Sequence, residues 1–365
     1  MHLKQHATEN FRNLSALSFT PSSGINVISG DNGHGKTNLL ESIFLMTGSR
    51  SFRNSRDISL IKKDCDFSAL QSSFEGGGRE QQIKIRIVPS GRTASINGMD
   101  YASASAISGA FCCVVFSPEH LVLVKGPPVH RRQFIDTVLC QISPSYLHNI
   151  RNCNRLVIQR NSLLKQAGTI AAASEMLEVY NEQYLSLAWS VSRLRSRFCE
   201  KLCLTAKDYY NVLSDFKEQL YLHYESTLFE EDLPEDQQRE AARLRLIKSQ
   251  AEEIKLGYTI IGPHRDDLNV SLSGASSKLY ASQGQQRCIA LSMKLAEADL
   301  IEQSIGERPV MLLDDVLSEL DGKRQDCLIN GMQKGQSIIT SCTPQLIAGR
   351  ADAQVFTLEN GRWKV

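Results

Sequence analysis

The sequence predicts an α/β fold in which a mainly helical segment is inserted into a domain built on a mixed β-sheet. Short apolar runs that suit buried strands occur near both ends of the chain, at residues 25–28 and 310–313. Between them, from residue 129 to residue 256, apolar residues recur with helical spacing. A length of 365 residues is typical of two domains, or of one domain with a large insertion.

A glycine-rich stretch follows the first apolar run, with the pattern Gly-x-x-x-x-Gly-Lys-Thr at residues 30–37, and an apolar helical face follows it up to Met46. Strand, loop and helix together form a phosphate-binding loop, whose backbone N–H groups point at phosphate oxygens. Lys36 adds a positive charge at the β- and γ-phosphates, and the Thr37 hydroxyl is placed to bind Mg²⁺. The expected nucleotide contacts are Gly30, Asp31, Asn32, Gly33, His34, Gly35, Lys36 and Thr37. An ordinary glycine-rich turn, which is the alternative, does not require the flanking strand and helix.

The rest of the first 125 residues is predicted to be rich in β-strands. Residues 1–30 suit a short β-meander, and residues 83–87 alternate apolar and charged side chains before a turn and a second strand at 93–96. Residues 111–116 suit a buried strand. Arg12 lies between strand-like pieces of the meander, where it either reaches the nucleotide or is a solvated turn residue.

A change of character at Gly126-Pro127-Pro128 marks the start of the helical segment. Two runs of residues then keep the alternating 4-3 spacing of a heptad pattern. They comprise Tyr146, Ile150, Cys153, Val157, Arg160 and Leu164, and then Leu177, Tyr180, Tyr184, Leu187, Val191, Leu194 and Phe198. An antiparallel, coiled-coil-like hairpin with its turn at residues 166–173 fits this pattern, and so does a helix packed on a domain face. We expect a head at 1–125 and 257–365 and a helical arm at 126–256.

The second apolar run, at 310–313, ends in two carboxylates. Asp314 at the end of such a strand can lie beside the Mg²⁺ of the phosphate-binding loop, where it is the usual second anchor of the metal. Asp315 then lies next to the γ-phosphate, where a general base or a water-positioning group belongs. Solvation of two acidic residues at a loop is the alternative.

A second anion-binding device is predicted at Ser282, Gly284 and Gln285, which combine a hydroxyl and a flexible glycine with a helix N-terminus. Residues 30–37 already bind the phosphates of one nucleotide. We therefore expect Ser282 to reach the γ-phosphate of a nucleotide held by another subunit. A simple serine cap of the helix is the alternative. The expected catalytic residues are Lys36, Asp314, Asp315 and Ser282.

Charge and composition limit the class of protein. The chain has 41 basic and 40 acidic residues and a net charge of +1, so a nucleic-acid partner requires a local basic patch. Candidate patches are Arg193, Arg197 and Lys201 at helical spacing, and Arg50, Arg53, Arg56, Lys62 and Lys63. A solvated helix face is the alternative. A polar N-terminus, no apolar run of about 18 residues and ten cysteines without a Cys-x-x-Cys pair predict a cytoplasmic protein with reduced thiols and no membrane partner.

Together these motifs resemble the ABC-type ATPases, and among them the RecF family of bacterial recombination and repair ATPases, which is related to the structural-maintenance-of-chromosomes heads. The resemblance is carried by Asn10 to Leu14, Gly30 to Glu41, Ser51 to Arg53, Phe116 to Glu119, Lys125-Gly126 with Arg131-Arg132, Gly262 to Asp267, Ser282 to Arg287 and Leu313 to Asp315. It implies an ABC-type head split by a helical arm, and ATP-driven dimerisation on duplex DNA near single-strand gaps. It also implies weak, DNA-stimulated ATP hydrolysis that releases the protein, and cooperation with RecR and RecO in loading RecA.

The sequence departs from the wider ABC pattern at three places. Asp315 replaces the usual glutamate, which is consistent with slow turnover, Pro118-Glu119 stands where a glutamine is common, and Thr340-Ser341 stands where transporters have a histidine. A transporter subunit is therefore disfavoured, and so is a GTPase, because no Asn-Lys-x-Asp motif occurs. The remaining alternative is another ABC-type ATPase that acts as a nucleotide-gated scaffold or clamp.

Overall fold

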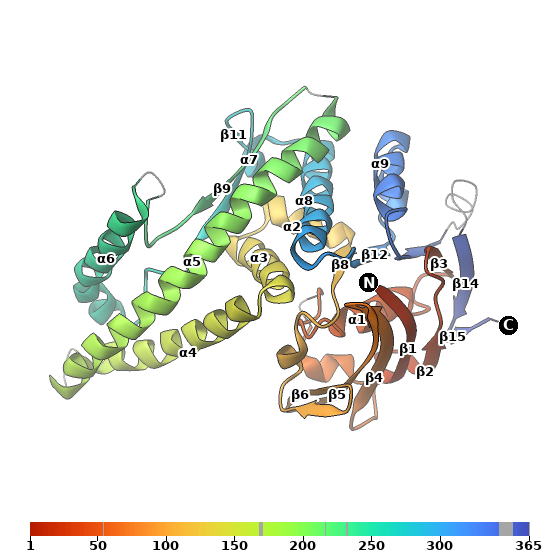
Figure 1. Cartoon of the computed structure of the whole chain (residues 1–365), viewed down its shortest axis with the longest axis horizontal. Helices are drawn as coiled ribbons and strands as arrows, with labels where there is room; N and C mark the ends of the chain where they lie inside the picture. The colour runs from red at the N-terminus through yellow and green to blue at the C-terminus, as the bar shows by residue number, and fades with distance from the viewer. Residues whose placement is uncertain (54, 168–170, 216, 231–232, 343–352, 365) are drawn as a thin grey trace. The chain divides into compact units, whose positions relative to one another are not determined.

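The helical segment is inserted into a sheet-containing domain, as predicted (Figure 1). The computed structural model describes residues 1–53, 55–167, 171–215, 217–230, 233–342 and 353–364. The first unit, called the head below, comprises Met1–Leu121, Thr205–Glu218 and Ser282–Val365, and the second, called the arm, comprises Val122–Leu204 and Gln219–Ala281. Residues 257–281 thus group with the arm, although the sequence placed them in the head. The cause is strand β10 (Asp267–Leu272), which pairs with β9 (Leu220–Glu225) of the arm.

An antiparallel six-stranded sheet forms one layer of the head. In order across the sheet its strands are β2 (Leu14–Phe19), β1 (His2–Phe11), β4 (Ser68–Gly76), β5 (Arg79–Val88), β6 (Gly91–Ile96) and β7 (Met99–Tyr101). Ile83, Ile85 and Ile87 of β5 are buried while Lys84 and Arg86 are exposed, so only one face of this sheet packs on the core. The predicted hairpin of β5 and β6 is confirmed.

A second six-stranded sheet is mainly parallel. In order its strands are β15 (Arg362–Trp363), β14 (Ala353–Glu359), β3 (Ile25–Ser29), β13 (Ser337–Ser341), β12 (Val310–Asp314) and β8 (Cys113–Phe116). The antiparallel β15 makes this sheet mixed, as predicted. The predicted meander of residues 1–30 is wrong in one respect, because β3 leaves β1 and β2 and pairs in parallel with β13 and β14.

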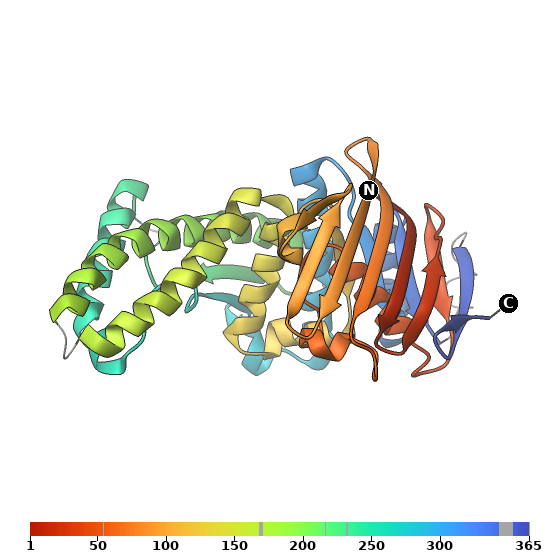
Figure 2. The same ribbon diagram turned by 90° about the horizontal axis from the view of Figure 1, so that it is seen from below.

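Helix α1 (Lys36–Leu45) lies between the two sheets of the head (Figure 2). It contacts β12, β13 and β8 on one side and β1 on the other, and both sheets contribute to one buried apolar cluster around it. Helix α8 (Gln283–Ile305) packs against β8 and against α9 (Gly322–Met332), on the side of the parallel sheet away from α1 (Figure 1). Short 3-10 helices at Asp57–Leu60, Ala104–Ile107, Pro118–Leu121 and Leu317–Glu319 connect these elements.

The buried ring of His6 joins α1 to the antiparallel sheet. Its Nε2 lies 2.7 Å from Ser42 Oγ of α1, and its Nδ1 lies 2.8 Å from Ser72 Oγ of β4. Because the Ser42 hydroxyl donates to Leu39 O, we assign Nε2 as the donor to Ser42 and Nδ1 as the acceptor from Ser72. Burial lowers the pKa of His6 from 6.5 to about 3.

His6 predicts an acid sensitivity of the head. The folded state binds this proton only near pH 3, whereas the unfolded chain binds it near pH 6.5. The contribution of neutral His6 to the free energy of unfolding is therefore complete above pH 6.5. Below pH 6.5 it falls by about 1.4 kcal/mol for each pH unit. Urea unfolding of the wild type and of His6→Gln at pH 7.5, 6.5 and 5.5 measures this. We expect the wild type to lose stability more steeply than the variant below pH 6.5, and equal slopes would contradict the assignment.

The arm combines helices with a three-stranded sheet. Its sheet has the order β11 (Ala275–Ser276), β10 and β9. Its helices are α2 (Val122–Lys125), α3 (Pro128–Ile142), α4 (Pro144–Ala167), most of α5 (Ala171–Ser214), α6 (Glu235–Leu256) and α7 (Ser277–Tyr280).

The predicted heptad residues of the arm are largely buried, but their burial involves a third helix. Arg160 of α4 occupies a seam position, where its guanidinium bonds Glu253 of α6 at 2.6 Å and Asn181 of α5 at 2.8 Å. Helix α4 therefore packs against α6 and also contacts α5 through Arg160 and Asn181. The turn predicted at residues 166–173 lies partly outside the described residues. In the described part of the chain, no helix has the length and apolar character needed to cross a membrane.

Candidate nucleotide-binding site

Three neighbouring parallel strands of the head end at the same edge of the sheet. Strand β3 runs into the glycine-rich loop, β12 ends at Asp314, and β13 brings Thr340 opposite Asp314. Carboxyl ends of parallel strands are where open α/β sheets bind ligands. The parallel register therefore brings residues 30–37 and Asp314 together, although about 280 residues separate them in the sequence.

The loop requires glycine at two positions in particular. A Cβ on Gly30, whose φ is +149°, would lie 2.2 Å from Leu358 O of β14. Gly35 precedes α1 in the left-handed region at φ +102°, and a Cβ there would lie 2.8 Å from Asn13 Oδ1. These two glycines let the backbone turn so that α1 begins at Lys36, with its free N–H groups at the loop.

Lys36 is buried against its own loop. Its ammonium group donates to Gly30 O at 2.6 Å and to Asp31 O at 3.0 Å, and it lies 3.5 Å from Cys342 Sγ. The Cys342 thiol in turn lies 3.3 Å from Asn32 Oδ1. The lysine charge is thus held at the loop, where a phosphate group would neutralise it.

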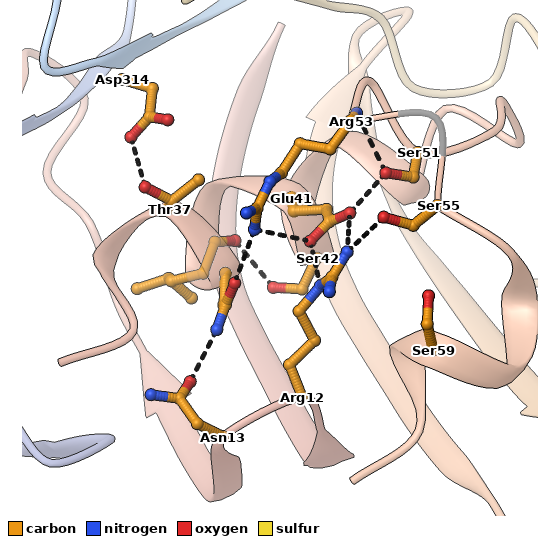
Figure 3. Close-up of polar contacts among 12 residues, drawn as sticks. Arg12, Asn13, Thr37, Glu41, Ser42, Ser51, Arg53, Ser55, Ser59 and Asp314 are labelled. Carbon is orange, nitrogen blue, oxygen red and sulfur yellow. Dashed lines mark hydrogen bonds and ion pairs between the residues drawn. The ribbon is translucent and has the colours of Figure 1, made fainter. Parts of the chain in front are cut away.

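Thr37 and Asp314 form the pair of oxygen ligands that Mg²⁺ prefers. The Thr37 hydroxyl donates to Asp314 Oδ1 at 2.7 Å, and the Thr340 hydroxyl donates to the same oxygen at 2.9 Å (Figure 3 shows the Thr37 contact). Burial raises the pKa of Asp314, and the bonds from Thr37 and Thr340 oppose that shift. A hydroxyl and a carboxylate fit Mg²⁺, which takes one or two protein ligands together with phosphate oxygens and water.

Asp315 has an unusual backbone. Its φ is +49°, a left-handed conformation that non-glycine residues seldom adopt. Its N–H donates to Thr340 Oγ1 at 3.1 Å, and its carbonyl accepts from Ser318 Oγ at 2.8 Å. These contacts fix the turn after β12, and such local strain is concentrated at functional sites.

Ser282, Gly284 and Gln285 stand at the start of α8, as predicted. Ser282 caps the helix, because its hydroxyl accepts from Gln285 N at 3.3 Å while Gln285 Oε1 accepts from Ser282 N at 2.5 Å. Ser282 is exposed. Across the described residues, no hydrogen bond joins these three residues to residues 30–37, so one chain does not unite the two predicted anion-binding devices.

Arg12 is neither a solvated turn residue nor an isolated side chain. Its Nε and Nη2 donate to the two carboxylate oxygens of Glu41 at 2.5 and 2.8 Å, and Nη2 also donates to Ser55 Oγ at 2.6 Å (Figure 3). The described residues offer no partner to its Nη1. That nitrogen can therefore donate to a ligand while Glu41 holds the guanidinium in place.

Sequence reasoning did not assign a role to Thr340, Asn13 or Glu41. The signal for Thr340 was its place at the end of the strand beside β12. Asn13 and Glu41 became visible only when the fold brought the turn between β1 and β2 against the loop and α1, where Asn13 Nδ2 donates to Gly33 O at 3.1 Å.

The Gly-Pro-His-Arg-Asp-Asp stretch at residues 262–267 lies in the arm and fixes its interior. Buried Asp266 accepts hydrogen bonds from Ser192, Tyr224 and Thr227, at 2.6 to 2.8 Å. Arg131 donates two hydrogen bonds to Asp267, at 2.8 and 2.7 Å. This stretch carries part of the family resemblance, and its two carboxylates have partners within the arm.

Comparisons with known proteins place this geometry in a family. The family model of the RecF/RecN/SMC N-terminal domain matches residues 2–362. The DNA replication and repair protein RecF of Lysinibacillus sphaericus is 37% identical over 366 residues, which cover 99% of each chain. The protein of the same name from an Exiguobacterium species is 37% identical over 365 residues, or 99% of this chain and 98% of the relative.

Solved structures agree in fold. The recombination mediator protein RecF-ATP in the RecFOR pathway has a TM-score of 0.92 and 31% identity, over 100% of this chain and 97% of that chain. The Smc head domain of Pyrococcus furiosus bound to the C-terminal domain of ScpA has a TM-score of 0.56 at 17% identity, over 100% of this chain and 95% of that chain, and shares the fold alone.

The two-sheet head, the glycine-rich loop before α1 and the aspartate at the end of β12 define an ABC-type ATPase head with an inserted helical arm. Within that class, the chain belongs to the RecF family.

Proposed function

We propose that this chain is an ATP-binding and ATP-hydrolysing mediator of DNA recombination and repair that acts in the RecFOR pathway. The observation that carries the proposal is the loop-to-Asp314 geometry, in a chain 37% identical over 99% of its length to a DNA replication and repair protein RecF. The relative with the TM-score of 0.92 is described with ATP, which supports ATP as the nucleotide here.

Each residue of the site has a defined role in this proposal. The loop N–H groups and Lys36 bind the β- and γ-phosphates, and Arg12 Nη1 adds a further donor. Thr37 and Asp314 would hold Mg²⁺, which would neutralise charge on the phosphates. Asp315 positions and deprotonates the attacking water. A short carboxylate on a constrained turn is consistent with slow hydrolysis.

The second half of the site is supplied by another copy of the chain. Ser282, Gly284 and Gln285 of one protomer contact the γ-phosphate held by residues 30–37 of its partner, so ATP favours the dimer and ADP does not. Ser282 is exposed, and this supports such a contact because its hydroxyl can be reached from outside the protomer.

Duplex DNA next to a single-strand gap is the proposed partner of this dimer, with RecR and RecO acting alongside it in loading RecA. Arg197 and Lys201 are exposed on α5 in the arm, and Arg50, Arg56 and Lys63 are exposed in the head. Such side chains contact phosphates without reading sequence. A dimer presents twice as many of these basic side chains to the DNA phosphates as one chain does. This compensates for the low net charge of +1 on each chain.

Sedimentation of the full chain tests this function. We expect a monomer without nucleotide or with ADP, a dimer with ATP and Mg²⁺, and a larger complex with ATP and a gapped duplex. The dimer forms because the γ-phosphate is shared between the two protomers. Ser282→Arg fills the shared position with a long side chain and is expected to remain monomeric while it still binds ATP. A wild-type monomer under every condition would rule out the shared site.

The second candidate function, a nucleotide-gated scaffold, differs in its need for turnover. The strained and buttressed turn at Asp315 favours a hydrolytic role over the scaffold, because a scaffold has no use for a positioned carboxylate at this point.

A further inference from the structure

A chain of polar contacts leads from the phosphate-binding loop to a buried carboxylate beneath it. Asn13 Nδ2 donates to Gly33 O at 3.1 Å, and Asn38 Nδ2 donates to Asn13 Oδ1 at 2.8 Å. Arg53 Nη1 donates to Asn38 Oδ1 at 3.2 Å and lies 3.9 Å from Glu41 Oε2. Figure 3 shows Arg12, Ser51 and Arg53 gathered at Glu41.

Glu41 is the centre of this network. Its side chain is fully buried, and both of its oxygens accept from Arg12. Ser51 donates to the same carboxylate, and the Ser51 hydroxyl accepts from Arg53 N at 3.1 Å. One carboxylate therefore holds Arg12, Ser51 and Arg53.

The position of Glu41 relates it directly to the nucleotide-binding residues. Glu41 follows Thr37 by four residues and Asn38 by three in α1, so that it lies one turn after each of them and neighbours both. A buried carboxylate is costly unless it is paired. Among the described residues Glu41 is paired with Arg12, Ser51 and Arg53. Arg53 also donates to Asn38, which connects Glu41 to the loop through Asn13.

We propose that Glu41 is a positioning residue of the nucleotide-binding site. It holds Arg12 so that Nη1 donates to the phosphates, and through Arg53 and Asn38 it keeps Asn13 against the loop. It acts through these side chains and does not touch the nucleotide. The proposal rests on the proposed ATP binding and adds the residue that sets the affinity of the site.

The test compares Glu41→Gln with Glu41→Asp and Arg12→Ala in the full chain. Glutamine keeps the size of the side chain but removes the charge that holds two arginines. We expect it to weaken binding of a fluorescent ATP analogue by about tenfold, since charge-assisted hydrogen bonds are roughly twice as strong as neutral ones. We also expect KM to rise by a similar factor and kcat to stay within about twofold, because Asp315 and the metal ligands are untouched. Aspartate keeps the charge and is expected to restore part of the affinity.

Glu297→Gln is the matched control. Glu297 is also a buried carboxylate of the head and pairs with Lys294 on α8, away from the loop. We expect this variant to lower the thermal midpoint while nucleotide affinity is unchanged. The double variant Arg12→Ala/Glu41→Gln tests whether the two residues act together. We expect its affinity for the nucleotide to equal that of whichever single variant binds less tightly.

The outcomes separate this inference from the proposed function. Wild-type affinity in Glu41→Gln, or an equal loss in Glu297→Gln, overturns the positioning role and leaves ATP binding intact. Failure of the wild type itself to bind the analogue would overturn the proposed function.

Discussion

Lys36→Ala is expected to lose ATP affinity by about 100-fold. The ammonium group is held against Gly30 O and Asp31 O, so its charge is already in place before a phosphate arrives. Hydrogen bonds to charged groups contribute about 1.5–3 kcal/mol each, and 100-fold in affinity corresponds to about 2.7 kcal/mol. ATP-dependent dimerisation is expected to disappear with binding, because the nucleotide joins the protomers.

Titration of a fluorescent ATP analogue into the wild type and the variant measures the affinity, and sedimentation measures the dimer. Lys4→Ala is the matched control, because Lys4 lies in the same head, in an exposed ion pair with Glu75 at 2.9 Å. It is expected to bind ATP like the wild type. Retention of both ATP binding and the ATP-dependent dimer in Lys36→Ala would refute the role of the loop.

Much of the nucleotide site could be predicted from the sequence because its chemistry is local. The spacing from Gly30 to Thr37 is fixed by the backbone turn that the loop needs, and the strand-end position of Asp314 is fixed by the length of its apolar run. The parallel pairing of β3, β13 and β12 then determines that these segments meet. Both the glycine-rich motif and the apolar run before Asp314 are short stretches that can be identified directly in the sequence.

The polar network around Glu41 was not predictable in the same way. Its members come from the end of β1 and the turn after it, from α1, and from Ser51, Arg53 and Ser55, and no spacing rule relates them. Arg12 shows why the partners of these side chains could not be predicted, because its sequence context allowed both a ligand contact and a solvated turn. Its partner is a buried carboxylate, which only the packing of α1 between two sheets reveals.

The limits of the arm were missed for a related reason. The return of apolar strands after residue 257 was visible, but whether β10 belongs to the head depends on its pairing partner. That partner is β9, on the arm side of the chain. Likewise, the heptad pattern indicated buried faces on α4 and α5, but α6 shares that burial through Glu253 and Arg160.

Asp315→Asn is expected to reduce the rate of ATP hydrolysis by about 100-fold or more and to leave ATP binding within about twofold of the wild type. Asparagine also tolerates the left-handed backbone that Asp315 adopts at φ +49°, so the turn with Thr340 and Ser318 is preserved. What the variant loses is a carboxylate able to accept a proton from water, and general bases contribute about 10²–10⁴-fold.

The consequence for the cycle follows from the shared γ-phosphate. If hydrolysis reopens the dimer, an Asp315→Asn dimer formed with ATP on a gapped duplex will persist long after the wild type has dissociated. Single-turnover hydrolysis and the dissociation rate from labelled DNA are measured on the same protein. Ser318→Ala, which removes only the hydroxyl that buttresses the Asp315 carbonyl, is the control and is expected to hydrolyse ATP within about tenfold of the wild type. Slow hydrolysis with an unchanged dissociation rate would favour the scaffold, because release would then not depend on turnover.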